Sequence, residues 1–499
     1  MEGLQGILFG FSIALNPINL LYCFFGVTIG TLVGVLPGLG PTAAISLLIP
    51  TTFHASPESG FIMLAGIYYG AMYGGSTTSI LVNIPGEAAS VVTCIDGYKM
   101  ARQGRAGPAL GISAFGSFIG GTFSIVGLML AAPPLARMAL RFGPPEYFSL
   151  MILGLTILSY LSGGSMVKSL MMASFGILLG CVGVDTVNGM NRFIYGIPEL
   201  MDGIGIVPIV MGLFGISEVI LNVEQSLKRE IFVKKVKNLL PNWKDWKDSL
   251  GAIFRGTFVG FFLGILPGGG TIVASFASYA IEKKVSKHPE QFGQGAIAGV
   301  AAPETANNAA TGGAFIPLLT LGIPANAVMA VLLGALMIHG LQTGPLLMKE
   351  APNIFWGTIT SMYVGNVLLL ILNLPLIPLW VKLLRIPYVL LFPLIILFCL
   401  IGAYSLNNSI VDLLIMILFG LVGYLFKKFK YEGAPFVLAF ILGPMLENAL
   451  RQSLIISNGS FWIFFSRPLS AGLIIVAVIL LFSPLVLRRR PTAGLKDED

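Results

Sequence analysis

The sequence predicts an all-α, polytopic membrane protein with about 11–12 transmembrane helices and two re-entrant helical hairpins, arranged as two inverted repeats. The first observation is composition, because 55% of the 499 residues are hydrophobic and only 11% are charged, with a mean hydropathy of +0.87. Water-soluble domains do not carry that much apolar surface. The second is length: apolar runs at residues 110–136, 147–184 and 469–487 contain at most one charge, and a helix needs roughly 20 such residues to cross a bilayer.

The third observation is a break rich in glycine and proline that occurs twice. Residues 30–42 read GTLVGVLPGLGPT, and residues 260–271 read GFFLGILPGGGT. Residues 1–98 contain no Lys or Arg, whereas basic residues at 228–255 and 283–287 flank the second break. Because basic loops stay in the cytoplasm, the first hairpin is expected to begin and end outside and the second inside. Two such segments entering from opposite faces indicate an inverted repeat.

A second pair of breaks follows the hairpins. Residues 74–79 read GGSTTS and are followed by Ile84-Pro85-Gly86, while residues 312–314 read GGA and are followed by Ile323-Pro324-Ala325. The chain then meets basic residues at 99–105 in the first copy and the uncharged residues 340–347 in the second. This opposite charge asymmetry again favours inversion.

The resulting organisation has two membrane repeats joined by a polar linker. Four further apolar segments in the first half and five in the second return the chain to the cytoplasmic side each time, so we expect a periplasmic N-terminus and a cytoplasmic C-terminus. The predicted ranges are 1–227 for the first repeat (hairpin 18–53, broken helices 60–98, scaffold helices 107–223), 228–249 for the cytoplasmic linker, 250–490 for the second repeat (hairpin 250–282, broken helices 294–340, scaffold helices 353–487) and 491–499 for a cytoplasmic tail.

The hairpin tips are the predicted substrate site. Non-helical backbone at membrane depth is tolerated only where protein or a water-filled cavity satisfies it, and helix N-terminal amides after the glycines attract anions. Close helix packing is an alternative explanation for Gly30, Gly34, Gly260 and Gly264, but it does not explain the Pro-Gly tips. The candidate substrate-binding residues are Pro37, Gly38, Leu39, Gly40, Thr42, Pro267, Gly268, Gly269, Gly270 and Thr271.

The polar run at residues 303–313 is the predicted ion site. Asn307 and Asn308 offer carbonyl oxygens to a hard cation, and Glu304 can ligate a cation or carry a proton. In the first half, the matching place is occupied by Ser76, Thr77, Thr78, Ser79, Asn83 and Glu87, of which Asn83 is the candidate ion ligand. An alternative is that Glu304, which follows Pro303, only caps a helix at the cytoplasmic interface.

Enzymatic chemistry is not predicted. The chain has no HExxH, GxSxG or Walker motif, and its three histidines and four cysteines are widely separated, so no catalytic set, transition-metal site, cofactor or disulfide is expected. The net charge of +7 comes from short clusters between apolar segments. Such clusters report membrane topology and do not indicate nucleic-acid binding.

Three motifs are similar to those of a known family. They are GVLPGLGPT at 34–42, YGGSTTSILVNIPG at 73–86 and APETANNAATGGAFIPLLTLGIP at 302–324. Over about residues 20–450 the chain resembles the large membrane subunit (TctA type) of tripartite tricarboxylate transporters. Thr305 and Thr311 stand where small residues are usual in that family.

The resemblance implies uptake of citrate or another carboxylate across the bacterial inner membrane, driven by an ion gradient, usually sodium. It also implies two partners, a small four-helix membrane subunit (TctB type) and a periplasmic substrate-binding protein (TctC type). Similarity to other transporters with paired hairpins implies an elevator movement. Two alternative functions stay open: a transporter of the same family with a non-tricarboxylate substrate, and a gated anion channel. The oligomeric state also stays open, and a homo-oligomer is one of its possibilities.

Overall fold

A computed structural model describes residues 3–36, 40–161, 165–185, 187–224, 239–341, 343–383 and 388–486. These residues are almost entirely helical, and the strands among them, β1 (Gly183–Val184) and β2 (Asn191–Arg192), form one short antiparallel pair. The predicted all-α class is therefore confirmed. Three predicted features lie wholly or partly outside the described residues: the tip residues Pro37–Leu39, the first half of the linker (228–238) and the tail 491–499.

The first half runs to residue 224. Its helices are α1 (Leu4–Ala14), α2 (Pro17–Val35), α3 (Pro41–Thr52), α4 (Pro57–Val82), the 3₁₀ turn η1 (Ala88–Ser90), α5 (Val91–Arg102), α6 (Ala106–Ala139), α7 (Pro144–Leu161), α8 (Met166–Gly180), η2 (Pro198–Leu200), α9 (Ile206–Val210), the π-helical η3 (Met211–Ile216) and α10 (Ser217–Glu224).

The second half begins with α11, whose capping box on Asn242 starts the helix inside the predicted linker. Its helices are α11 (Trp243–Ile265), α12 (Gly270–Val285), η4 (Pro289–Gln291), α13 (Ala298–Leu321), α14 (Ala327–Ile338), α15 (Leu347–Glu350), α16 (Pro352–Asn373), α17 (Ile377–Leu383), α18 (Tyr388–Asn407), α19 (Ile410–Lys428), α20 (Gly433–Ile456), α21 (Ile463–Ser466) and α22 (Pro468–Val486).

The described helices make this a multi-pass membrane protein. Seven of them are long and apolar enough to cross a membrane: Pro17–Val35, Ala106–Ala139, Ile206–Glu224, Trp243–Ile265, Pro352–Asn373, Ile410–Lys428 and Gly433–Ile456. Five shorter apolar helices accompany them: Gln5–Ala14, Met166–Gly180, Ala327–Ile338, Leu391–Asn407 and Pro468–Ser483. The larger count of spanning helices predicted above stays a prediction.

Glycines hold each hairpin helix directly against the backbone of a neighbour. A Cβ added at Gly30 would lie 3.0 Å or less from backbone atoms of Ile67 and its neighbour on α4, and one at Gly260 would lie less than 3.0 Å from backbone atoms of Ala306 on α13. Flanking glycines spaced by four residues meet the same two helices in rising order, so both pairs pack in parallel. The matching contacts are Gly26 with Met63 and Gly34 with Ala71 on α4, and Gly256 with Ala302 and Gly264 with Ala310 on α13.

The chain reverses at both Pro-Gly breaks. On α11 and α12, Arg255 forms a bidentate ion pair with Glu282 at 2.7 and 2.8 Å, and these residues lie at similar distances along the chain from the break, so the helices are antiparallel. At the first break the evidence comes from contacts with α4. Gly34, near the end of α2, meets Ala71 in the second half of α4, whereas Thr52, at the end of α3, meets Gly60 near the start of α4. Helix α3 therefore runs back along α4, which gives a second hairpin.

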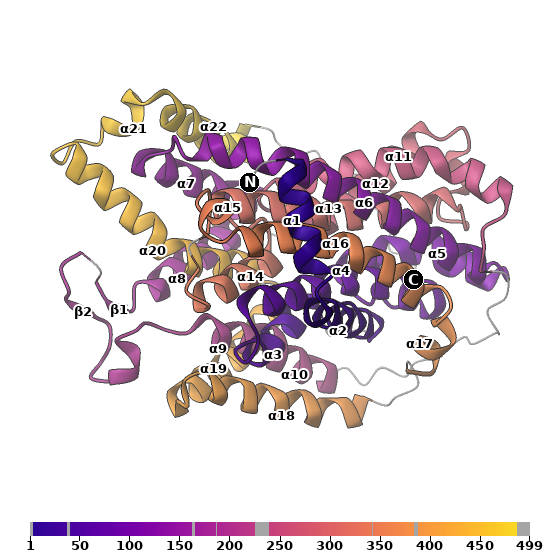
Figure 1. Cartoon of the computed structure of the whole chain (residues 1–499), viewed down its shortest axis with the longest axis horizontal. Coiled ribbons are helices and arrows are strands. Elements are labelled where there is room, and N and C mark those ends of the chain that lie inside the picture. The colour runs from indigo at the N-terminus through magenta and orange to yellow at the C-terminus, as the bar shows by residue number, and fades with distance from the viewer. Residues whose placement is uncertain are drawn as a thin grey trace.

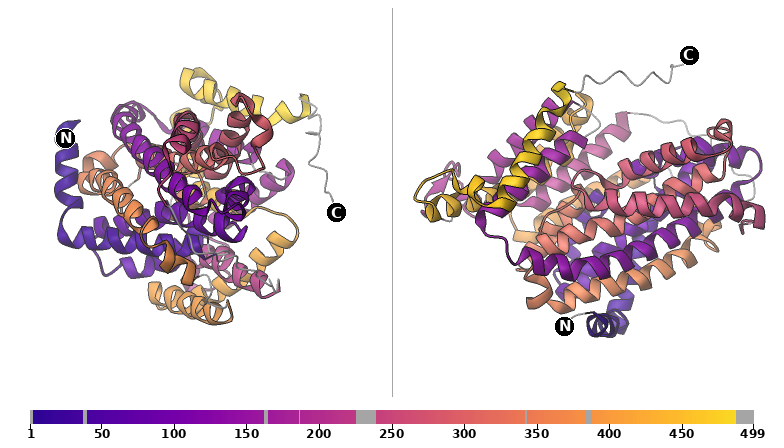
Figure 2. Two further views of the ribbon diagram at one scale, coloured as in Figure 1. Left: turned by 90° about the vertical axis from the view of Figure 1, so that its right-hand side faces the viewer. Right: turned by 90° about the horizontal axis from the view of Figure 1, so that it is seen from above.

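Two groups of helices flank this central bundle. Helix α20 packs on α7 and α8, and α22 packs on α7, while α19 packs on α9, η3 and α10, and α18 on η3 and α19. Figure 1 shows α7, α8, α20 and α22 at one end, α18, α19 and α10 along the lower edge, and the hairpin α11–α12 at the opposite end. In the right-hand view of Figure 2, the yellow C-terminal helices lie to one side of the larger bundle.

Candidate functional site

The two Pro-Gly breaks line one cavity of about 660 Å³. Gly40 and Thr42 come from the first break, and Gly268 to Thr271 come from the second. The structure thus brings together six of the ten predicted substrate residues, from hairpins about 230 positions apart in the chain. Of the other four, Pro267 lies in the second break but not on the cavity wall. Pro37–Leu39 are outside the described residues.

Four helix N-termini meet at this cavity. They belong to α3, preceded by Gly40, to α12, which starts at Gly270, to η1 after Glu87 and to α14 after Asn326. Helix α12 packs against η1, and α3 packs against α14, so each hairpin helix starts beside the break of the other half. The starts of α3 and α12 have no side-chain cap, which leaves their first amides for a ligand. No Lys, Arg or His is among the cavity-lining residues that the structure describes.

Glycine is required at the second tip for a backbone reason. Gly268 has φ +80° and donates its amide to the carbonyl of Ala325 at 2.8 Å. A Cβ there would lie 2.6 Å from Cα of Leu158 on α7, so a larger residue would collide with the flanking helix as well as strain the backbone. Gly270 also has a positive φ, +52°, but faces open space.

The predicted substrate site did not include four polar side chains of the cavity wall, which are Tyr68, Glu87, Asn326 and Glu432; Glu87 was expected only in the polar stretch that matches the ion site. Asn326 caps α14 through the amide of Met329 at 3.0 Å and donates to the Tyr68 hydroxyl at 3.0 Å. Glu87 caps η1 through the amide of Ala89 at 2.6 Å. A signal was available, because Glu87 follows Ile-Pro-Gly and Asn326 follows Ile-Pro-Ala at corresponding places in the two halves.

Glu304 lies in the protein interior and does not cap a helix at an interface, which corrects that alternative. It is in the body of α13, is 1% exposed and accepts hydrogen bonds from Ser76 on α4 and Thr93 on α5. The polar run 303–313 needed partners, and the hydroxyls of α4 and α5 supply them. No basic side chain pairs with Glu304 in the described structure.

Asn307 and Asn308 extend this buried polar layer. Asn307 donates to Glu87 at 3.2 Å, and its Oδ1 is buried without a hydrogen-bond partner in the described part of the chain. Asn308 donates to the hydroxyl of Ser117 at 2.8 Å and to the Glu304 carbonyl at 3.1 Å. Asn83 is not brought into this network, because it is exposed at the left-handed C-cap of α4, with φ 58°.

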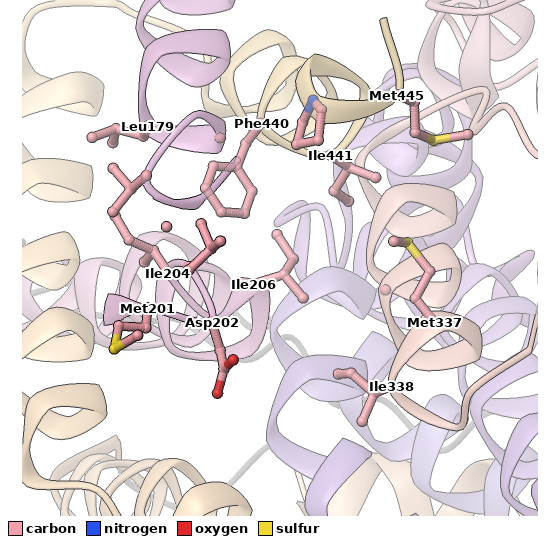
Figure 3. A pocket seen from close by; sticks show the side chains of 17 residues that line it. Leu179, Met201, Asp202, Ile204, Ile206, Met337, Ile338, Phe440, Ile441 and Met445 are labelled. Carbon is pink, nitrogen blue, oxygen red and sulfur yellow. The ribbon is translucent and has the colours of Figure 1, made fainter. Parts of the chain in front are cut away.

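A second cavity, of about 560 Å³, lies between α14 and the helices α8, α9 and α20. Figure 3 shows that its wall is built from apolar side chains such as Met201, Ile206 and Phe440, with the Asp202 carboxylate at one edge. Among its lining residues Asp202 carries the only charge, and it is negative. An anion would find no donor side chain there, so the cavity at the hairpin tips is the candidate site.

Comparison with known proteins places the chain in a family. Residues 20–438 match the model of the tripartite tricarboxylate transporter TctA family. A protein of Agrobacterium vitis described as an uncharacterized 52.8 kDa protein in the TAR-I ttuC' 3' region is 52% identical over 478 residues, which cover 96% of this chain and 95% of that protein. A second A. vitis protein, from the TAR-II ttuC' 3' region, is 50% identical over 242 residues, 48% of this chain and all of that protein. No solved structure matches the chain. The chain therefore belongs to the tripartite tricarboxylate transporter TctA family, a family of transporters and not of enzymes.

Proposed function

We propose that the chain is the large transmembrane subunit of a binding-protein-dependent secondary transporter that imports citrate-like tricarboxylates or related carboxylates together with sodium. The observation that carries the proposal is the single cavity lined by both hairpin tips and by four helix N-termini. Backbone amides there can bind carboxylate oxygens without a basic side chain. Gly40, Thr42 and Gly268–Thr271 are the proposed contacts, with Pro37–Leu39 and Pro267 shaping the tips.

The buried polar layer supports cation coupling. No basic side chain among the described residues pairs with Glu304, and a buried carboxylate is costly unless a positive charge compensates it. The Oδ1 of Asn307 is buried and has no hydrogen-bond partner in the part of the chain that the structure describes. The side-chain nitrogen of Asn308 already donates to Ser117 and to the Glu304 carbonyl. Oxygen ligands of this kind suit a hard cation. We propose Glu304, Asn307 and Asn308 as the ion-binding residues, with Asn83 as a further candidate beside the α4 break.

The packing also supports two inverted repeats and an elevator movement. The parallel pairs α2–α4 and α11–α13 use the same glycine spacing. The segment α9–α10 of the first half packs on α19 of the second half, and α20 and α22 of the second half pack on α7 of the first. In this proposal α2–α5 and α11–α14 move with the cavity, and α7–α10 and α18–α22 form the scaffold.

Polar contacts between distant segments support the proposed topology, because each one joins groups predicted on the same side. On the predicted cytoplasmic side these are Arg105–Asp245, Lys427–Glu218, Lys99–Gly293 and Lys168–Phe429. On the predicted periplasmic side they are Arg192–Glu447, Arg451–Asp185, Arg467–Glu146 and Asn353–Glu58. Leu158 and Glu432, at the predicted cytoplasmic ends of scaffold helices, line the tip cavity, which favours an inward-facing state.

Family membership supports the remaining parts of the proposal. The chain would act in the bacterial inner membrane with a TctB-type four-helix subunit and a TctC-type periplasmic binding protein. The alternatives are a transporter of the same family for a non-tricarboxylate substrate and, less well supported, a gated anion channel, which would need a continuous pore.

Reconstituted vesicles separate these functions. With the two partner proteins and an inward sodium gradient, labelled citrate is expected to accumulate above its external concentration, and collapse of the gradient is expected to stop accumulation. Flux that only equilibrates citrate would indicate a channel. If citrate fails, uptake of other carboxylates selected by thermal shift of the periplasmic protein would identify the cargo.

A further inference from the structure

Glu87 and Asn326 occupy corresponding places in the two halves of the chain. Each follows an Ile-Pro dipeptide and one small residue, each caps the next helix through its side chain, and each lines the tip cavity. The pair differs in charge, because Asn326 is neutral and Glu87 is acidic. An anion in the cavity thus meets an amide from one half and a carboxyl group from the other.

Glu87 has no positive partner among its described contacts. It is 6% exposed, and its oxygens accept from the amide of Ala89 at 2.6 Å and from Asn307 at 3.2 Å. The titratable groups facing it are Tyr68 on α4 and Glu304 on α13, with Glu432 before α20 on the same cavity. None of these supplies a cation. An ionised Glu87 would therefore repel a substrate carboxylate in the same low-dielectric space.

Asn307 adds an independent observation. Its Nδ2 donates to Glu87, while its Oδ1 is buried and lacks a partner in the described structure. Such an orphaned acceptor is costly in a protein interior. A single positive charge between Glu87 and Asn307 would compensate the carboxylate and, after rotation of the amide, would satisfy this oxygen.

We propose that Glu87 is the coupling residue of the site, and that a monovalent cation must neutralise it before a carboxylate substrate can bind. This inference rests on the proposed function and adds a residue and a binding order to it. The cation is Na⁺, with the Glu87 carboxylate and the Oδ1 of Asn307 as its proposed ligands. Binding of cation and substrate is then reciprocal, since each favours the state that accepts the other.

The test is equilibrium binding of labelled citrate to the purified full-length chain in lipid nanodiscs. NaCl is replaced by choline chloride in one series, and pH is varied at constant sodium in the other. For the wild type, removal of sodium is expected to weaken binding about 5–150-fold, the usual range of site coupling. Binding that follows pH but ignores sodium would contradict sodium as the cation.

Glu87→Gln is the decisive variant. Its amide oxygen can still accept from Ala89, and Asn307 can turn its Oδ1 toward the new amide, so the capping interactions survive. The variant is expected to bind citrate without sodium about as tightly as the wild type binds it with sodium. Glu432→Gln is the matched control, because Glu432 lines the same cavity but is only partly buried; it is expected to keep the wild-type dependence.

Asn326→Asp supplies a reciprocal test that does not depend on the folding of the first variant. Aspartate is a good N-cap and can accept from Met329, so the helix start is preserved. A second carboxylate in the same cavity is expected to steepen the sodium dependence of citrate binding. Unchanged sodium dependence in Glu87→Gln and in Asn326→Asp would overturn the proposal.

Failure of the proposed function gives a different pattern. If the wild type binds neither citrate nor any other carboxylate tested, the function is wrong, and the role of Glu87 is judged by sodium binding alone. The unfolding temperature of the wild type without substrate is then expected to rise when sodium is added. That rise is expected to vanish in Glu87→Gln but persist in Glu432→Gln. A rise that persists in Glu87→Gln contradicts the role of Glu87.

Discussion

Gly40 is the residue at which the tip cavity can be filled with the least disturbance. Its φ of −74° suits any amino acid, and no atom lies within 4 Å of an added Cβ. Gly268 offers no such freedom, because a side chain there collides with α7. A loss of transport on changing Gly268 would therefore not distinguish a binding defect from a packing defect.

We predict that Gly40→Leu abolishes most uptake while the protein remains folded. The leucine would cover the first amides of α3, and each hydrogen bond to a charged group contributes about 1.5–3 kcal/mol, so loss of one weakens binding about ten- to hundredfold. Citrate uptake in proteoliposomes and thermal unfolding in detergent measure the two effects.

Gly472→Leu on α22, also without neighbours within 4 Å of an added Cβ, is the control and should transport normally. Wild-type uptake by Gly40→Leu would exclude this tip from the site.

Asp185 provides a prediction about acid stability. The amide of Val187 donates to this carboxylate at 2.8 Å, and Asn188, Arg451 and Arg192 add further hydrogen bonds and charge, so the pKa of Asp185 lies below its usual value. A carboxyl group whose folded pKa is depressed stabilises the fold above its unfolded pKa, and this contribution is lost as pH falls through the folded pKa.

We therefore expect thermal stability to drop between about pH 5 and pH 2 partly through Asp185. Asp185→Asn should be less stable than the wild type at neutral pH and should lose less on acidification. Asp202→Asn changes an exposed residue of the same loop and should follow the wild type. Equal acid sensitivity of all three proteins would show that Asp185 contributes nothing to this pH dependence.

At the scale of elements, the hairpin helices depend on glycine contacts. The parallel packing of α11 on α13 allows no side chain at Gly260, and the packing of α2 on α4 allows none at Gly30. Backbone-to-backbone approach of this kind is how small residues hold membrane helices together without a hydrophobic driving force.

Gly260→Ala and Gly30→Ala are each expected to lower stability by about 1–3 kcal/mol, the usual cost of an extra methyl group in a filled interior. Thermal or denaturant unfolding in detergent measures this. Gly472→Ala should be neutral or slightly stabilising, because alanine favours helix more than glycine does. If Gly260→Ala matched Gly472→Ala, the close contact between α11 and α13 would be wrong.

At the scale of the whole molecule, the proposed movement can be locked by a disulfide. An added Cβ at Gly334 on α14 would lie 3.9 Å from Cβ of Ile206 on α9, within the 3.5–4.5 Å of a disulfide. In the proposed elevator α14 moves and α9 does not. Oxidised Ile206→Cys/Gly334→Cys is therefore expected to lose uptake, and reduction should restore it.

A cross-link inside the scaffold is the matched control. A Cβ at Gly215 would lie 3.2 Å from Sγ of Cys399, and both belong to scaffold helices, so oxidised Gly215→Cys should transport normally. Cross-linking is followed by mass spectrometry, with each single-cysteine variant beside it. Full uptake by the fully oxidised α9–α14 pair would exclude movement between these two helices.

Local sequence was enough to predict the helical membrane fold and both hairpin breaks. Consecutive proline and glycine residues disfavour a continuous helix more strongly than an isolated proline or glycine does. The runs at 37–41 and 267–270 therefore predicted breaks just before α3 and α12, which start at Pro41 and Gly270, without knowledge of their neighbours. The four-residue spacing of glycines likewise indicated close packing, although the partners α4 and α13 could not be named from it.

The surroundings of each polar group were decided by tertiary structure alone. Glu304 is a buried acceptor because α4 and α5 bring Ser76 and Thr93 to it, and Pro303 before it gave no hint of that. Tyr68 on α4 and Glu432 just before α20 line the same cavity although they lie far apart in the chain. A sequence records which residues can break a helix or carry a charge, but desolvation and hydrogen bonding depend on which segments fold against one another.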